Sequence, residues 1–254
     1  MENDSNILHN ENNFFTANKL KMIAIILMLL DHFVVIFIQE ESVLHMVLII
    51  PGRIVSPIIC FLISEGYHYT SNRKNYIFRL FVLAVVSHIP FNIAFNHSLS
   101  PLEATSVIWA LVMGLVALTA LKSNLPVVLK PLILVLCCIA AYTANWNFIA
   151  VLWIVAFGLF HGNFKRQMVA FCAVGIVCNL MPSYLRYIFS SGNYLHWYQL
   201  GIFLAVPFLA LYSGKLGKKS KAMSYSFYVF YPMHLILLFI LNHYTPLAEM
   251  LGRL

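Results

Sequence analysis

Nine apolar segments, separated by short polar connections, make up most of this 254-residue chain. Each segment is close to the roughly 20 residues that an α-helix needs to cross about 30 Å of hydrocarbon. Only 10% of the residues are charged, whereas an ordinary soluble domain has about a quarter. This composition excludes a soluble globular domain. The sequence therefore predicts an all-α, polytopic bundle of nine to ten transmembrane helices, with spans near residues 20–38, 43–65, 76–95, 105–121, 127–144, 146–161, 167–189, 195–212 and 225–243.

The first eighteen residues are polar and acidic and contain no Lys or Arg. A cleaved secretory signal peptide begins with basic residues, so we expect none here. The sequence predicts a polar tail over residues 1–18 and a single membrane domain over residues 19–254. The five cysteines lie within apolar segments and form no CxxC pair, which predicts neither a disulfide framework nor a metal site.

The basic residues predict the orientation of the bundle, because cytoplasmic loops of membrane proteins are enriched in Lys and Arg. With nine spans and a cytoplasmic N-terminus, 13 of the 16 Lys and Arg residues fall in cytoplasmic segments, Arg186 and Arg253 fall outside, and Arg53 falls within the membrane. We therefore expect a cytoplasmic N-terminus, an external C-terminus and a multi-pass protein of the inner (cytoplasmic) membrane. The net charge of +7 follows from this bias and does not indicate nucleic-acid binding.

The second span contains Pro51, Gly52 and Pro57 within the segment IIPGRIVSP. Proline removes a helical hydrogen bond. Non-helical backbone at membrane depth is tolerated where it is buried in protein or lines a cavity. This composition favours a break in the second span.

Five polar residues from four predicted spans fall near the bilayer midplane: Asp31, His32, Arg53, His88 and His234. Their depths follow from a helical rise of about 1.5 Å per residue. A charged side chain at the centre of a bilayer costs at least about 2.5–3.5 kcal/mol, so such residues are expected to face one another or a wet cavity. Opposite charges offset each other's desolvation, which predicts an ion pair between Asp31 and Arg53.

His32 follows Asp31 but points about 100° away around a helix, so it can meet a different partner. A histidine with a polar helper is typical of a general base, which removes a proton from an attacking hydroxyl or amine. Asp31 need not be that helper. A proton relay in a transporter or flippase would use the same residue types, and so would a cluster that only locks helices together. The residues alone leave these three alternatives open.

Three segments resemble the TraX family: LKMIAIILMLLDH at residues 20–32, GRIVSPIICFLISEGYHYTSNRKNYIFRLFVLAVVSHIPFNIAF at residues 52–95, and FYPMHLILLF at residues 230–239. The resemblance extends from about Leu20 to Leu241. The namesake of this family is a membrane protein that acetylates the N-terminus of F pilin. The resemblance implies a membrane acyltransferase with acetyl-CoA as donor and no metal. Its acceptor would be an amine or hydroxyl of a peptide, such as pilin, or of an envelope glycan.

Lys21 and His32 also keep a spacing that resembles a wider group of membrane acyltransferases acting on envelope sugars, in which ten residues separate an Arg from a His in the first span. By this resemblance His32 is the catalytic base. We expect the pair of Asp31 and Arg53 beside it, and His88 and His234 in the lining of its cavity, where they bind or relay protons. Lys21 and Arg53 would help to hold the donor, whose phosphates need cations. Further candidates for the donor site are Arg79, Tyr228 and Tyr231.

One position departs from the family pattern. Relatives often carry Ala-Asp-Trp or Ala-Asp-Tyr before the sixth span, whereas this chain has Ala144, Asn145 and Trp146. An amide replaces the acid here, so a role that needs a carboxylate at this position is not carried over.

Overall fold

The computed structural model describes residues 14–38, 42–189, 197–218 and 221–245. Within these ranges the chain is helical and contains no β-strand, which confirms the all-α prediction. The α-helices are α1 (Ala17–Phe37), α2 (Val43–Leu48), α3 (Val55–Tyr69), α4 (Arg73–Ala94), α5 (Val107–Leu121), α6 (Leu129–Ala140), α7 (Asn147–Leu159), α8 (Phe164–Gly175), α9 (Met181–Phe189), α10 (Ala205–Ala210) and α11 (Lys221–Tyr244). The short 3-10 and π segments are η1 (Pro51–Ile54), η2 (Ile176–Leu180) and η3 (Trp197–Leu204).

Five helical segments of the described residues are long and apolar enough to cross a membrane: Ala17–Phe37, Val43–Tyr69, Arg73–Ala94, Phe164–Phe189 and Tyr225–Tyr244. The chain is therefore a multi-pass membrane protein. The other four predicted spans correspond to shorter apolar helices, namely Val107–Leu121, Leu129–Ala140, Asn147–Leu159 and Trp197–Ala210. That these four also cross the membrane, and that the N-terminus is cytoplasmic, stay predictions.

The structure contains the break that the composition of the second predicted span favours. After α2 the chain turns through the single 3-10 turn η1, which starts at Pro51, and then continues as α3. This turn brings the backbone of Gly52 and Arg53 against α1. The proline-glycine pair therefore positions a charged residue within the membrane domain.

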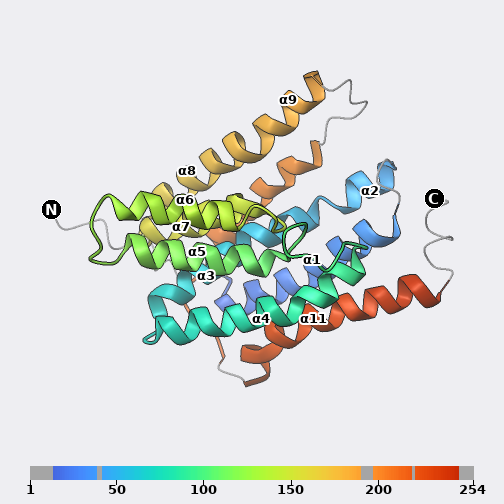
Figure 1. The fold of residues 1–254 in the computed structure, drawn as a ribbon, viewed down its shortest axis with the longest axis horizontal. Helices are drawn as coiled ribbons and strands as arrows, with labels where there is room; N and C mark the ends of the chain where they lie inside the picture. Colours follow the sequence, from blue (N-terminus) through green and yellow to red (C-terminus); the bar gives the residue numbers. More distant parts are fainter. Residues whose placement is uncertain (1–13, 39–41, 190–196, 219–220, 246–254) are drawn as a thin grey trace.

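The centre of the bundle is formed by α3, α5 and α7, which pack against one another. Their contact faces carry fully buried side chains, among them Ile58, Leu111, Leu115, Trp153 and Phe157. Figure 1 shows α4 and α11 lying side by side along one edge of this centre, while α8 and α9 diverge on the other. The helix α11 also packs against α1, so α1 lies between α11 and the α3 side of this centre.

The start of α1 is fixed to the loop that precedes α11. The backbone N–H groups of Phe15, Ala17 and Asn18 donate to the carbonyls of Leu211, Lys215 and Leu216 at 3.0, 2.9 and 3.1 Å. The Thr16 side chain caps the helix, so α1 begins at Ala17 rather than at residue 20. The rest of the predicted polar tail, residues 1–13, lies outside the described residues.

Candidate functional site

A cavity of about 410 Å³ lies where the ends of α1, α2, α4, η1 and η3 meet two loops, at residues 95–106 and 141–146. We name it the histidine cavity, after His32, His45 and His97 in its wall. Its other lining residues are Asp31, Val35, Ile49, Arg53, Phe91, Phe95, Ala104, Thr105, Thr143, Ala144, Asn145 and Tyr198.

Asp31 and Arg53 form an ion pair in this cavity, from a carboxylate oxygen to Nη2, as the sequence predicted. The pair is mostly buried, and the guanidinium also lies over the Trp146 ring, 5.6 Å from its centroid. The Arg53 Nε atom is buried, and no described residue offers it a hydrogen-bond partner. Asp31 and Arg53 therefore bind each other, and one face of the guanidinium packs on an aromatic ring.

Gly52 makes this pair possible by its lack of a side chain. A Cβ atom at position 52 would lie 2.6 Å from the Cβ of Asp31 and would overlap its carboxylate. The backbone of η1 can therefore approach α1 closely enough for Arg53 to reach Asp31 only when residue 52 is glycine.

His32 bonds to His234 rather than to Asp31. The distance from His32 Nδ1 to His234 Nε2 is 2.7 Å, and the distance from His234 Nδ1 to the Phe230 carbonyl oxygen is 2.8 Å. A carbonyl only accepts, so His234 Nδ1 carries a hydrogen and its Nε2, in a neutral ring, is the acceptor. His32 Nδ1–H then donates to it. This chain of bonds leaves Nε2 of a neutral His32 unprotonated.

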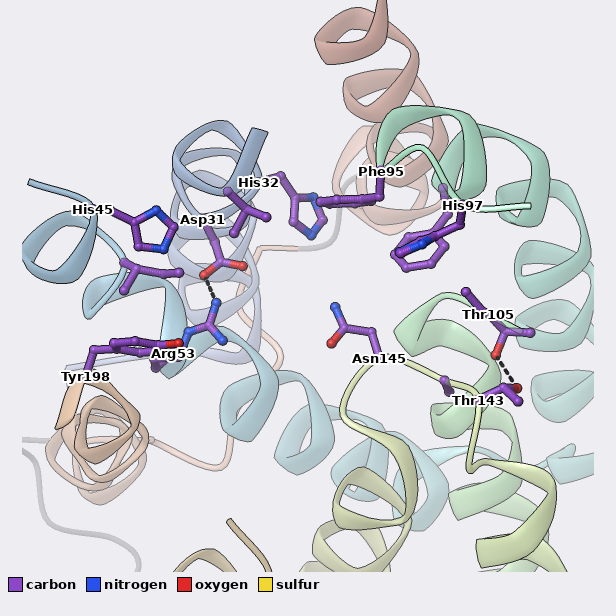
Figure 2. A pocket seen from close by; sticks show the side chains of 15 residues that line it. Asp31, His32, His45, Arg53, Phe95, His97, Thr105, Thr143, Asn145 and Tyr198 are labelled. Atoms are coloured by element: carbon purple, nitrogen blue, oxygen red, sulfur yellow. Dashed lines mark hydrogen bonds and ion pairs between the residues drawn. The ribbon is translucent and has the colours of Figure 1, made fainter. Parts of the chain in front are cut away.

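Both imidazoles are buried, with 6% and 3% of their surface exposed, and the Phe95 ring packs edge-on against His32. Figure 2 shows the His32 ring beside Phe95, at the edge of the histidine cavity. Bonding and packing together hold His32 in one orientation, with an open lone pair on Nε2.

The opposite wall is built by two loops that pair with each other. The Thr105 N–H donates to the Thr143 carbonyl at 2.9 Å, and the Asn145 N–H donates to the Thr105 carbonyl at 3.0 Å. The backbone then passes through the left-handed region at Trp146, with φ of 63°, before α7 begins. In Figure 2 the Asn145 amide projects into the cavity between the Asp31–Arg53 pair and the two threonines.

The sequence reasoning missed several members of this wall: His45, His97, Thr105, Thr143 and Tyr198. His45 is almost fully buried and lies within 3.2 Å of the Ile38 carbonyl through Nδ1. These residues lie in loops and at helix ends, whereas the depth argument searched only the middle of spans. Asn145 differs from the acidic residue of the family pattern, and this sequence difference marks a position in the wall of the histidine cavity.

A second cavity, of about 710 Å³, lies at the other end of α1. We name it the tyrosine cavity, because Tyr69, Tyr76, Tyr212 and Tyr228 line it. Its cationic residues are Lys21 and Arg79, and apolar groups form most of the remaining wall. Its one described acid, Glu65, is paired with His161 at 3.1 Å. Lys21 and His32 therefore lie on one helix but in different cavities, about 16 Å apart by helical rise.

Three predicted positions differ from this arrangement. Arg53 was expected to hold the donor with Lys21, but it lies in the histidine cavity and is bound to Asp31. Tyr231 lines neither cavity and is buried between them. His88 does not line the histidine cavity; its Nε2 lies 3.0 Å from the Leu99 carbonyl. Depth along a helix places such a residue but does not specify its rotation about the axis.

Lys21, Arg79 and Tyr228 do meet in one cavity, and Asp31, His32, Arg53 and His234 meet around the other. Among the described residues, no group of three or more His, Cys, Asp or Glu is placed to hold a metal ion. The fold and the site thus define a multi-pass α-helical membrane protein with an orientated histidine in the wall of a charged cavity and a second, cation-containing cavity at the other end of the same helix.

The comparisons with known proteins give the family. The family described as TraX protein matches residues 16–242, and the chain belongs to this family. It is also similar to the probable fimbrial assembly protein FimC, serogroup H1, of Dichelobacter nodosus, with 31% identity over 232 residues that cover 88% of this chain and 94% of that protein. No solved structure matches the chain.

Proposed function

We propose that this protein is a membrane acyltransferase that moves an acetyl group from acetyl-CoA to an amine or hydroxyl, with His32 as the general base. The observation that carries the proposal is the bond from His32 to His234, which leaves His32 Nε2 unprotonated at the edge of a cavity. In known triads a third group holds the catalytic imidazole in one tautomer. Here the Phe230 carbonyl and His234 would do so.

The donor would enter the tyrosine cavity. Lys21 and Arg79 supply the cations that a polyphosphate needs, and the tyrosine rings offer surfaces for a nucleotide base. The charge bias of the sequence assigns this end of α1 to the cytoplasm, where acetyl-CoA is made. The acyl end of the donor would then extend along α1 toward His32.

The acceptor would occupy the histidine cavity. Its amine or hydroxyl would lose a proton to His32 Nε2 and attack the thioester carbon. When the carbon–sulfur bond breaks, the electron pair goes to sulfur, and the coenzyme A thiolate takes the proton back from His32. Asp31, Asn145 and the two threonines would contact the acceptor from the opposite walls.

The acceptor class is an amine or hydroxyl of a peptide or of an envelope glycan. The printed name of the Dichelobacter relative refers to fimbrial assembly. That name, together with TraX family membership, favours a fimbrial or pilin-type peptide as the acceptor to test first.

The experiment measures thioester hydrolysis and acetyl-CoA binding by purified protein in detergent. Water replaces the unknown acceptor, so slow release of free thiol reports the chemistry. His32→Ala should abolish thiol release, and His234→Ala should lower it roughly 10- to 100-fold, because general-base catalysis contributes about 10²–10⁴-fold. Both variants should still bind acetyl-CoA, since neither residue lines the tyrosine cavity.

His88→Ala is the matched control, because His88 is also a histidine of a long helix but does not line the histidine cavity. It should retain the wild-type rate. No saturable binding of acetyl-CoA by the folded wild-type protein at millimolar concentration would refute the acyltransferase and favour a transporter.

A further inference from the structure

We propose that the hydroxyl groups of Tyr231 and Ser106 bind the carbonyl oxygen of the donor thioester and stabilise the negative charge that this oxygen gains during acyl transfer. The inference rests on the proposed function, and it assigns to the two residues a catalytic role distinct from the general base.

Both hydroxyl groups are buried. Tyr231 and Ser106 each have 1% of their surface exposed, and within the described residues neither oxygen reaches full hydrogen-bond geometry. The two hydroxyls lie close enough for a long bond to each other, and such a bond leaves one hydroxyl hydrogen of the pair without an acceptor. Burying a hydroxyl without a partner costs about 1–3 kcal/mol, so an unsatisfied pair in a native protein indicates a missing ligand or a functional role.

Tyr231 lies between the catalytic histidines and the donor cavity. Its ring centroid is 6.4 Å from that of His32 and 5.6 Å from that of His234. On its other side the ring is 6.2 Å from Phe227, which lines the tyrosine cavity. Tyr231 therefore connects the histidine pair to the wall of the tyrosine cavity, and its hydroxyl would meet a thioester that extends from that cavity toward His32.

Ser106 adds the N-terminus of α5. It occupies the N-cap position of this 15-residue helix, but its hydroxyl makes no capping bond. The N-terminus of a helix carries partial positive charge and unsatisfied N–H groups, both of which favour an anion. The preceding residue, Thr105, lines the histidine cavity, and its backbone bonds to Thr143 and Asn145 fix this helix end in place.

The chemistry requires such donors. When the acceptor attacks the thioester carbon, the carbon–oxygen π electrons move to the oxygen and form a tetrahedral oxyanion. When the carbon–sulfur bond breaks, those electrons return to the carbonyl and the sulfur leaves as a thiolate. Tyr231 and Ser106 keep their protons throughout and donate hydrogen bonds to the oxygen. Such donors are most effective when they are already in place and no water competes with them.

Tyr231→Phe tests this role, because it removes one oxygen and leaves the ring that packs against His234. We expect kcat for thioester hydrolysis to fall roughly 100- to 1,000-fold, the usual effect of removing one oxyanion donor. The affinity for acetyl-CoA should change less than about threefold, since the bond strengthens only in the transition state. Ser106→Ala should give a smaller fall in kcat of the same kind.

Two control variants separate catalysis from packing. Tyr67→Phe removes a tyrosine hydroxyl that is as deeply buried, and Ser64→Ala removes a buried hydroxyl that also lacks a partner; neither residue lines a cavity. Both should keep the wild-type kcat. Thermal unfolding in detergent shows that all four variants are folded.

The outcomes distinguish this inference from the proposed function. An active wild-type protein whose Tyr231→Phe variant keeps its kcat overturns the oxyanion role and leaves the general base intact. A fall in thermal stability at unchanged kcat overturns it too, since it assigns the hydroxyls to packing. A wild-type protein that neither binds nor hydrolyses acetyl-CoA overturns both.

Discussion

Asp31 and His32, two polar residues of the histidine cavity, each have a fixed partner on another helix or turn. Asp31 on α1 holds Arg53 on η1, and His32 on α1 holds His234 on α11. The two neighbours on α1 thus bind different elements, because successive residues of a helix point about 100° apart. Asp31 is therefore available to stabilise Arg53, while the orientation of His32 depends on His234.

Breaking the ion pair has a predictable cost. Asp31→Asn or Arg53→Gln should lower the free energy of unfolding by about 2–3 kcal/mol, somewhat less than the roughly 3–5 kcal/mol of a fully buried pair, because this pair retains some exposure. Each single change leaves one group without its partner, so the double variant should lose clearly less than the sum of the two. Thermal unfolding of all four proteins in detergent measures this coupling, and strictly additive losses would contradict the pair.

At the scale of elements, the site depends on an interruption of a helix. The turn η1 separates α2 from α3 and places Arg53 in contact with Asp31. The loops at residues 95–106 and 141–146 form the opposite wall of the histidine cavity. Between regular helices only side chains touch, whereas this turn also brings the Gly52 backbone against α1. A broken span is tolerated in a membrane domain because protein buries it.

Gly52→Ala tests the role of this turn. A Cβ atom there would overlap the Asp31 side chain, so the ion pair has to move apart. We expect a loss of at least about 1–3 kcal/mol in stability, the usual cost of overpacking a close contact, and a loss of the proposed hydrolysis. Circular dichroism melting and thiol release measure the two effects.

Gly175→Ala is the comparison variant for this turn. Its Cβ atom would first meet the terminal carbon of the Ile202 side chain, at 2.9 Å, which can move away. It should melt and react like the wild type. Equal behaviour of the Gly52 and Gly175 variants would show that η1 does not need its close approach to α1.

At the scale of the whole molecule, the structure places the two cavities at the two ends of α1. The sequence predicted which residues share a depth, because depth follows from helical rise and loop charge. Depth and charge predicted the Asp31–Arg53 pair, and depth placed His234 at the level of His32 without predicting the bond between them. It could not predict rotation, so His88 was expected in a cavity that it does not line.

The sequence predicts the positions of the helices better than it predicts how many of them cross the membrane. Nine apolar segments become helices, but only five of those described are long enough by length and composition to span a bilayer unaided. His45 on the short helix α2 and the loop residues His97 and Thr143 could not be predicted, since nothing in a linear sequence shows which segments meet in space. The sequence predicted that Arg53 helps to bind the donor, because it is a cation. In the structure its ion pair with Asp31 holds it in the histidine cavity instead.

We propose that His32 acts between a cytoplasmic donor cavity and an outer acceptor cavity. Sealed membrane vesicles of both orientations test it most directly, with external acetyl-CoA, thiol release as the readout and His32→Ala vesicles as background. We expect His32-dependent hydrolysis in inside-out vesicles, which expose the cytoplasmic face, and none in right-side-out vesicles. Equal hydrolysis from both faces, hydrolysis only from the outer face, or no difference between wild type and His32→Ala would contradict it.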